Sequence, residues 1–248
     1  MRATYAGQSR LALMPRPRSA SSRRSLSDPS PDEVRLAAEA LRAGDARADA
    51  LFDGLLPPAL RAVSDDYWTP APVVRQVAAW LREEGIGTIV DIGSGAGKFC
   101  VATALLTGCR VIGLEQRPSL VTAARALATR CGVDARVTFI SGAFGAVPTP
   151  PADAYYLFNP FSEYTFESAE AAGDEVTFTR ETWQRDVDAM TRFLAGLPVG
   201  AVVVTYNGFG RYPPRTFEQT RVDVTFRGAL RLWTKRAAPP RPRAVTRT

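Results

Sequence analysis

One stretch, VDIGSGAGKF at residues 90–99, constrains the fold of this 248-residue chain more than any other. Three glycines, Gly93, Gly95 and Gly97, stand within five positions and follow a short apolar run. Glycine loses the most conformational freedom on folding, so this cluster predicts that the backbone turns sharply or lies against another group. The apolar run predicts a buried strand and the residues after the glycines predict a helix. The glycines therefore mark a turn from strand to helix.

The rest of the chain repeats this alternation, which is typical of a parallel sheet with helices on both faces. We therefore predict an α/β protein with a Rossmann-like, doubly wound, mostly parallel seven-stranded sheet, an antiparallel C-terminal hairpin and an N-terminal helical cap. Thr69 is expected to cap a helix that begins at Pro70. The strands are expected at 87–93, 110–115, 136–144, 152–161 and 201–207 and the hairpin at 215–236, with helices at 31–44, 45–64, 70–84, 97–108, 117–132 and 181–197.

Unusual residues stand at the carboxyl ends of the first four predicted strands. The glycine loop follows the first strand, Glu115 ends the second, residues 141–144 end the third, and residues 159–161 follow the fourth. In an open parallel sheet, ligands bind in the crevice outside these carboxyl ends. The sequence therefore predicts one ligand site at this edge of the sheet.

Two common phosphate-binding motifs do not fit the glycine loop. A P-loop requires glycine at position 92 and serine or threonine at position 99, where the chain has Ile92 and Phe99. A dinucleotide fingerprint requires glycine at position 98, where the side chain of Lys98 is expected to prevent close packing of helix on strand. The remaining spacing, D-x-G-x-G-x-G beginning at Asp91, resembles motif I of the class I S-adenosylmethionine-dependent methyltransferases.

The resemblance covers roughly residues 67–234 and implies S-adenosylmethionine as the cofactor. In this family the glycine loop lies against the amino-acid end of the cofactor, and an acid at the position of Glu115 holds the ribose hydroxyls. The segment DYWTP at residues 66–70 is similar to one that covers the cofactor in a branch of protein-lysine methyltransferases. Ala143 replaces the family's adenine-binding acid, so backbone groups and Phe144 are expected to hold the adenine. The implied cofactor-binding residues are Tyr67, Thr69, Asp91, Gly93, Gly95, Gly97, Glu115, Gln116, Ala143, Phe144 and Asn159.

Asn159-Pro160-Phe161 resembles the (D/N)-P-P-(Y/F/W) motif IV of family members that methylate amino groups, although the second proline is missing. In those members the Asn or Asp oxygen accepts a hydrogen bond from the amino group, and the aromatic ring packs against it. These three residues are therefore the predicted catalytic residues, and Glu163 is either an assisting base or a solvent-facing residue. The predicted function is methylation of an amino nitrogen on a protein or a small molecule. The alternatives are a non-catalytic S-adenosylmethionine-binding module, an RNA methyltransferase and an NAD(P)-dependent oxidoreductase.

Composition excludes several other kinds of site. The chain has no histidine, which rules out Ser-His-Asp chemistry and most zinc sites, so no metal is expected. Its three cysteines lack C-x-x-C spacing and indicate free thiols in a reducing compartment, so a cytoplasmic location is expected. No apolar run approaches the roughly 18 residues of a membrane span, so no membrane is expected as a partner.

The net charge of +6 is concentrated at the two ends of the chain. Residues 1–30 carry six arginines and one aspartate, and residues 235–248 carry one lysine and four arginines without an acid. The segment between them has 20 basic and 24 acidic residues, a net of −4, which disfavours nucleic acid as the partner. The predicted organisation is a disordered basic tail over 1–30, a helical cap over 31–66, an S-adenosylmethionine-binding methyltransferase domain over 67–236 and a disordered basic tail over 237–248.

Overall fold

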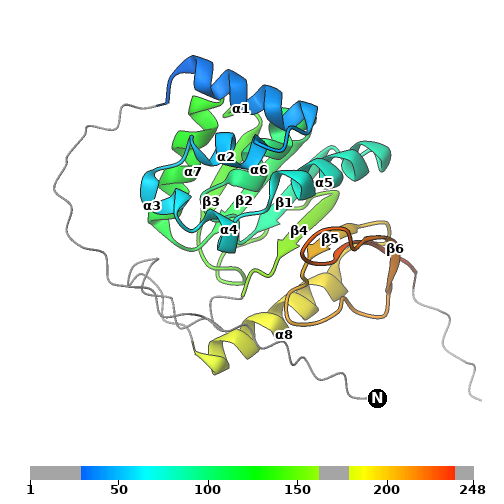
Figure 1. The fold of residues 1–248 in the computed structure, drawn as a ribbon. Helices are drawn as coiled ribbons and strands as arrows, with labels where there is room; N and C mark the ends of the chain where they lie inside the picture. The colour runs from blue at the N-terminus through cyan, green and yellow to red at the C-terminus, as the bar shows by residue number, and fades with distance from the viewer. Residues whose placement is uncertain (1–28, 162–178, 238–248) are drawn as a thin grey trace, which may run out of the picture.

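The computed structural model describes residues 29–161 and 179–237, and its centre is a seven-stranded sheet (Figure 1). The strand order is β3-β2-β1-β4-β5-β7-β6. The first five strands in sequence run parallel, whereas β7 pairs antiparallel with both β5 and β6. This confirms the predicted Rossmann-like sheet with its antiparallel C-terminal hairpin. The strands are β1 Thr88–Ile92, β2 Arg110–Glu115, β3 Val137–Ser141, β4 Ala154–Phe158, β5 Val202–Tyr206, β6 Phe217–Asp223 and β7 Leu230–Lys235.

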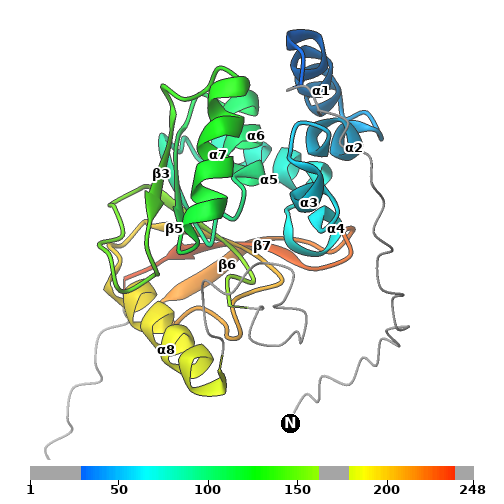
Figure 2. The same ribbon diagram turned by 90° about the vertical axis from the view of Figure 1, so that its left-hand side faces the viewer.

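Helices cover both faces of the sheet, as the sequence predicts (Figure 2). Successive residues of a strand point to opposite faces, so Ile89 packs with α5, α6 and α7 while Val90 packs with α8. Tyr156 and Tyr155 of β4 divide between the two faces in the same way. The apolar strands are thus buried on both sides. These helices are α5 Ala71–Glu83, α6 Lys98–Leu106, α7 Pro118–Arg130 and α8 Arg180–Gly196.

The N-terminal helical cap lies beside α5, α6 and α7 (Figure 2). Its first helix, α1 Pro31–Ala43, begins at a capping box in which the Ser30 hydroxyl accepts a hydrogen bond from the Glu33 backbone N–H. The predicted single helix over 45–64 is wrong, because Gly54 and the prolines that follow it interrupt the helical hydrogen bonds. The cap instead continues as three short helices: α2 Ala48–Asp53, α3 Pro58–Arg61 and α4 Ser64–Tyr67.

The start of α5 also differs from its prediction. The helix begins at Ala71, and Thr69 does not cap it, because the Thr69 hydroxyl lies 3.0 Å from the hydroxyl of Tyr156. The Asp49 carboxylate of α2 takes this role by accepting a hydrogen bond from the Ala71 N–H at 2.7 Å. The helical cap therefore supplies a polar group that satisfies the first turn of α5.

Several predictions concern residues outside the described ranges. They include Glu163 and nearly all of both basic tails, and the predicted domain boundaries also stay predictions. In residues 29–161 and 179–237, none of the helices has the length and apolar character that a membrane crossing requires.

Candidate functional site

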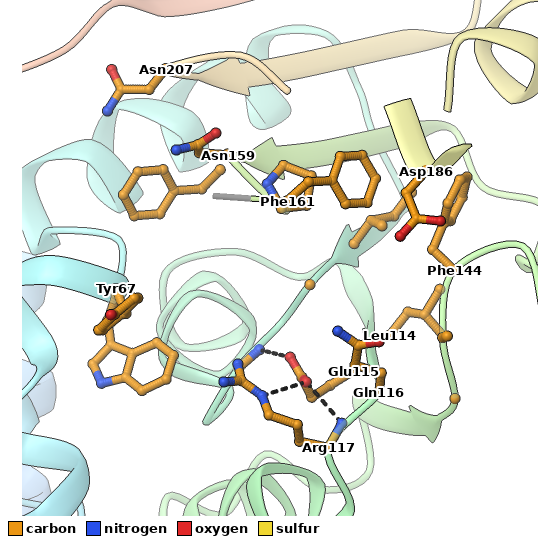
Figure 3. Close-up of a pocket in the computed structure, with 18 of the residues that line it drawn as sticks. Tyr67, Leu114, Glu115, Gln116, Arg117, Phe144, Asn159, Phe161, Asp186 and Asn207 are labelled. Atoms are coloured by element: carbon orange, nitrogen blue, oxygen red, sulfur yellow. Dashed lines mark hydrogen bonds and ion pairs between the residues drawn. The ribbon is translucent and has the colours of Figure 1, made fainter. Parts of the chain in front are cut away.

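A cavity of about 230 Å³ opens at the carboxyl ends of the parallel strands (Figure 3). Residues that follow β1, β2, β3 and β4 meet around it, as the sequence predicts for this edge of the sheet. We call it the glycine-loop cavity. Ten of the predicted site residues line it: Tyr67, Gly93, Gly95, Glu115, Gln116, Ala143, Phe144, Asn159, Pro160 and Phe161.

Two of the three loop glycines allow close approach of other parts of the chain at this cavity. Gly93 has φ 83°, and a Cβ on it would lie 3.2 Å from the Cβ of Pro160. Gly95 has φ 53°, and a Cβ on it would lie 2.2 Å from the indole ring of Trp68. The glycine loop is therefore in close contact with the Asn-Pro turn after β4 and with the segment before α5.

The third glycine lies away from the cavity. A Cβ on Gly97 would lie 2.8 Å from the ring of Phe139 on β3, so Gly97 allows α6 to pack closely on the sheet. The prediction that Lys98 prevents this packing is wrong, because its side chain turns toward the helical cap. The buried Lys98 ammonium lies 2.9 Å from Asp49 and 2.7 Å from Asp53 of α2.

Glu115 is the most fully engaged side chain of the glycine-loop cavity. Only 4% of the residue is exposed, and one carboxylate oxygen accepts a hydrogen bond from the Gly95 N–H at 2.9 Å. Its other oxygen accepts from the backbone N–H of Arg117 at 2.9 Å and from the Arg117 Nε at 3.1 Å (Figure 3). This carboxylate thus joins the loop after β1 to the loop after β2, and a buried ion pair balances its charge.

Asp91 and Thr69 lie beside the glycine-loop cavity rather than in its wall. Both line an inner pocket of about 20 Å³, which has room for one water molecule. Burial raises the pKa of Asp91 to about 7; a hydrogen bond that Cys100 Sγ donates at 3.3 Å opposes this rise, and the charge of Glu115 adds to it. Asp91 therefore titrates near neutral pH.

Two asparagines stand side by side at the ends of the paired strands β4 and β5. Asn159 has φ 42° and Asn207 has φ 60°, and among the described residues no other non-glycine residue has a positive φ. The left-handed region is disfavoured for residues with a Cβ, although asparagine tolerates it best. Both asparagines line the glycine-loop cavity. Backbone strain at two adjacent positions in one cavity points to a functional role.

Phe161 packs within the protein at the far side of the cavity. It is buried, and its ring centroid lies 6.4 Å from that of Phe144. Phe144 in turn contacts Phe193 of α8 edge-to-face at 5.5 Å between centroids. Phe161, the aromatic residue of the Asn-Pro-Phe motif, thus belongs to an aromatic cluster that closes the cavity on the α8 side.

Sequence reasoning missed several residues of this cavity. Arg117 could have been found as a cation two positions after a predicted buried acid. Asp66 and Trp68 belong to the segment DYWTP but were not predicted as site residues, because the sequence could not distinguish a cavity-lining residue from a core residue. Asp186 and Asn207 gave no signal, because α8 and β5 approach the cavity only in the folded chain. The residues missed include Asp66, Trp68, Arg117, Phe158, Asp186 and Asn207.

Comparison with known proteins gives one match in sequence and several in structure. No protein-family model matches the chain. The Type II methyltransferase M.XamI of Xanthomonas campestris pv. amaranthicola is 32% identical over 113 residues, which are 45% of this chain and 21% of that protein. The chain thus spans about a fifth of the length of this curated relative.

Two solved structures have the same arrangement of strands and helices. An RNA methyltransferase from Salinibacter ruber, in complex with S-adenosyl-L-homocysteine, matches with a TM-score of 0.50 and 22% identity, over 70% of this chain and 97% of that one. The Escherichia coli protein yhhF, a proposed methyltransferase, matches with a TM-score of 0.50 and 14% identity, over 70% of this chain and 90% of that one. At these identities the likeness shows the fold.

Proposed function

We propose that this chain, which has the class I S-adenosylmethionine-dependent methyltransferase fold, transfers a methyl group from S-adenosylmethionine to an amino nitrogen. The observation that carries the proposal is the contact between the glycine loop and the Asn-Pro turn. A Cβ on Gly93 would lie 3.2 Å from Pro160, so the motif expected to hold the methyl donor adjoins the motif expected to hold the acceptor.

The residues of the glycine-loop cavity suit the cofactor. Glu115 presents a buried carboxylate that can accept a hydrogen bond from a ribose hydroxyl beside those from Gly95 and Arg117. Gly93 and Gly95, both with a positive φ, place the loop backbone in the wall of this cavity beside Pro160 and Trp68. Ala143 and Phe144 offer a small apolar site for the adenine, and Tyr67 stands at the opposite wall (Figure 3).

Little chemistry is then required of the protein. When bound, S-adenosylmethionine would supply a methyl group on a positively charged sulfur, and the C–S bond would break, leaving a neutral thioether, as the nitrogen lone pair bonds to the carbon. The methylated nitrogen, then positively charged, would release a proton to solvent. The side-chain oxygen of Asn159 would accept a hydrogen bond from the amino group and so orient its lone pair. Phe158 and Phe161 would keep water away from the reacting atoms. A protein without histidine can perform these tasks.

The similar proteins support the transfer reaction more strongly than the acceptor. M.XamI is a methyltransferase by name, and the Salinibacter ruber protein is an RNA methyltransferase. RNA is the second candidate acceptor on that likeness. The segment 31–234 carries a net charge of −4, which opposes binding of a polyanion and favours the amine on a protein or a small molecule.

Calorimetry with three ligands tests the donor half of this proposal. S-Adenosylmethionine and S-adenosylhomocysteine should bind with micromolar affinity, and NADH should not bind. Tight NADH binding without S-adenosylmethionine binding would support the oxidoreductase alternative and contradict the proposal. A methyl-transfer assay with tritium-labelled S-adenosylmethionine then separates an enzyme from a module that only binds the cofactor.

A further inference from the structure

A second cavity of about 520 Å³ lies next to the glycine-loop cavity. Asp66, Trp68, Phe158 and Asn207 line both cavities, so the two adjoin at the end of β4 and β5. We call the second one the cap cavity, because residues of the helical cap form one of its walls. Its volume is in the range of small-molecule sites.

The cap cavity has walls from three parts of the chain. α4 contributes Asp65 and Asp66, and the loop between β6 and β7 contributes Phe226 and Arg227. The rings of Phe158 and Tyr206, 4.8 Å apart between centroids, also line the cavity. Aromatic rings of this kind attract both apolar chains and cations.

Charge is distributed unevenly over these walls. The carboxylate of Asp49 is already balanced, because it lies 2.9 Å from the Lys98 ammonium. The exposed side chains of Asp65 and Asp66 form no ion pair within residues 29–161 and 179–237. Arg227 stands on the hairpin wall, where its charge lowers the pKa of Tyr206 against the rise that burial causes. The α4 wall, which reaches the glycine-loop cavity at Asp66, therefore carries two carboxylates that are unpaired within the described ranges.

Asn207 lies where the two cavities join, and contacts with the loop between β6 and β7 fix its position. Its backbone N–H donates a hydrogen bond to the Ala229 carbonyl at 3.2 Å, and its φ is 60°. A Cβ on Gly228 would lie 1.7 Å from the Asn207 side-chain oxygen, so the glycine makes room for this amide. The Asn207 oxygen thus packs against Gly228, whereas Asn159 lines the glycine-loop cavity beside the junction. A neutral primary amine has two N–H donors and one lone pair, so one N–H could bond to the Asn159 oxygen while the lone pair faces the methyl donor.

We propose that the cap cavity binds the methyl acceptor, and that this acceptor is a primary aliphatic amine on a cationic molecule. The inference rests on the proposed function, whose acceptor it specifies. The acids of α4 attract the cation, the aromatic rings hold its alkyl chain, and Asn159 orients the reacting nitrogen. A lysine side chain of a peptide and a free polyamine share this chemistry. Nucleic acid does not, because its phosphates would face Asp65 and Asp66.

Binding of three probes to the protein loaded with S-adenosylhomocysteine tests this inference. The probes are spermidine, a pentapeptide with a central lysine between glycines, and a single-stranded RNA decamer. We expect spermidine, the lysine peptide or both to bind in the millimolar range or better, and the RNA to bind more weakly. Binding of the peptide alone identifies a peptide-borne lysine, and binding of spermidine alone identifies a polyamine.

Variants that remove a charge from either wall test whether the cap cavity favours a cation. Asp65→Asn and Asp66→Asn should each weaken amine binding about three- to tenfold, and Arg227→Gln should strengthen it about twofold. Asp134→Asn, an exposed acid between α7 and β3 at the opposite edge of the sheet, is the matched control and should change nothing. Stronger amine binding in the two aspartate variants together with weaker binding in Arg227→Gln, or RNA binding that Arg227→Gln abolishes, would overturn the inference. If the protein binds S-adenosylhomocysteine but no amine, the inference is wrong while the proposed function stands. If the protein does not bind S-adenosylhomocysteine, the proposed function itself is contradicted.

Discussion

The indole ring of Trp68 lies so close to Gly95 that a Cβ at position 95 would come within 2.2 Å of it. The space beside Gly95, the second loop glycine, is therefore occupied by a side chain of the protein itself. Trp68 also donates a hydrogen bond from its Nε1 to the Leu60 carbonyl at 3.1 Å, which joins the helical cap to the same contact. The cap and the glycine loop thus form one packed unit at the cavity.

Replacement of Gly95 by alanine should destabilise the protein as well as damage the cavity. The left-handed φ and the overlap with Trp68 together predict a loss of about 2–4 kcal/mol in the free energy of unfolding. Urea denaturation measures this loss. Gly108→Ala is the control, because nothing in the described structure lies within 4 Å of a Cβ there. Equal stability of the two variants would contradict the close contact of Trp68 with the loop.

Glu115 has separable roles in stability and in ligand binding. Glu115→Gln should reduce the free energy of unfolding by about 2–4 kcal/mol, because the buried Arg117 loses the charge it pairs with. The same variant should weaken S-adenosylhomocysteine binding about 10- to 100-fold, since a neutral amide replaces a charged acceptor.

The double variant Glu115→Gln, Arg117→Gln distinguishes the two effects of Glu115. It should regain much of the stability without regaining the affinity for S-adenosylhomocysteine. Glu39→Gln on the exposed face of α1 is a control for both measurements. If the double variant binds the ligand as the wild type does, Glu115 is a structural residue only.

The buried Lys98 ammonium holds the helical cap to α6. Lys98→Met should reduce the free energy of unfolding by about 3–5 kcal/mol, because Asp49 and Asp53 would keep their charges without their cation. Adding Asp49→Asn and Asp53→Asn to this variant should recover most of the loss. Arg35→Met, at an exposed ion pair of α1, should have little effect. An unchanged stability in Lys98→Met would show that the cap does not depend on this cluster.

The architecture of the sheet could be predicted from the sequence because its information is local. Short apolar runs, the glycine turn at Gly93 and the hairpin that begins at Arg215 each depend on a few neighbouring residues. Together they predicted a mostly parallel sheet with an antiparallel hairpin. The prediction of one helix over 45–64 was wrong because the helical spacing of apolar residues continues through Gly54 and Pro57, whereas the helical backbone hydrogen bonds do not. Helix breakers outweigh periodicity at such positions.

Only those site residues that lie at the ends of recognisable strands could be predicted from the sequence. Glu115 and Asn159 could be placed at this edge because Glu115 ends one recognisable strand and Asn159 directly follows another. The partners of Thr69 and Lys98 were not found, because Tyr156 and Asp53 are distant in sequence from them. A long-range hydrogen bond or ion pair leaves no periodic trace in either segment.

Asp91 should make stability depend on pH in a direction opposite to that of an ordinary surface acid. Its pKa in the folded protein is about 7, above the value of 3.8 for an unperturbed aspartate. The folded state therefore binds the proton more tightly, so the contribution of Asp91 is fully present below about pH 4 and is lost as the pH rises through 7. Relative to Asp91→Asn, the wild type should lose stability between about pH 4.5 and pH 8. Urea denaturation of the two proteins at several pH values checks this.

Asn159 is the residue on which the proposed transfer depends most. Its backbone N–H donates to the Gly208 carbonyl at 2.9 Å, and this hydrogen bond with φ 42° holds the turn at the cavity wall. Asn159→Ala removes the side-chain oxygen and should lower the methyl-transfer rate by about ten- to a thousandfold, because a positioning contact is lost. S-Adenosylhomocysteine affinity should change little, since Glu115 and the glycine loop are untouched.

Two further variants test whether the Asn159 oxygen acts as a hydrogen-bond acceptor. Asn159→Asp should retain more activity than Asn159→Ala, because a carboxylate oxygen also accepts from an amine. Asn159→Gly separates this role from backbone strain: glycine adopts a positive φ freely, so the variant should be folded and stable but as inactive as Asn159→Ala. If Asn159→Gly transfers methyl groups at the wild-type rate, then only the turn matters, and the amide has no part in orienting the acceptor.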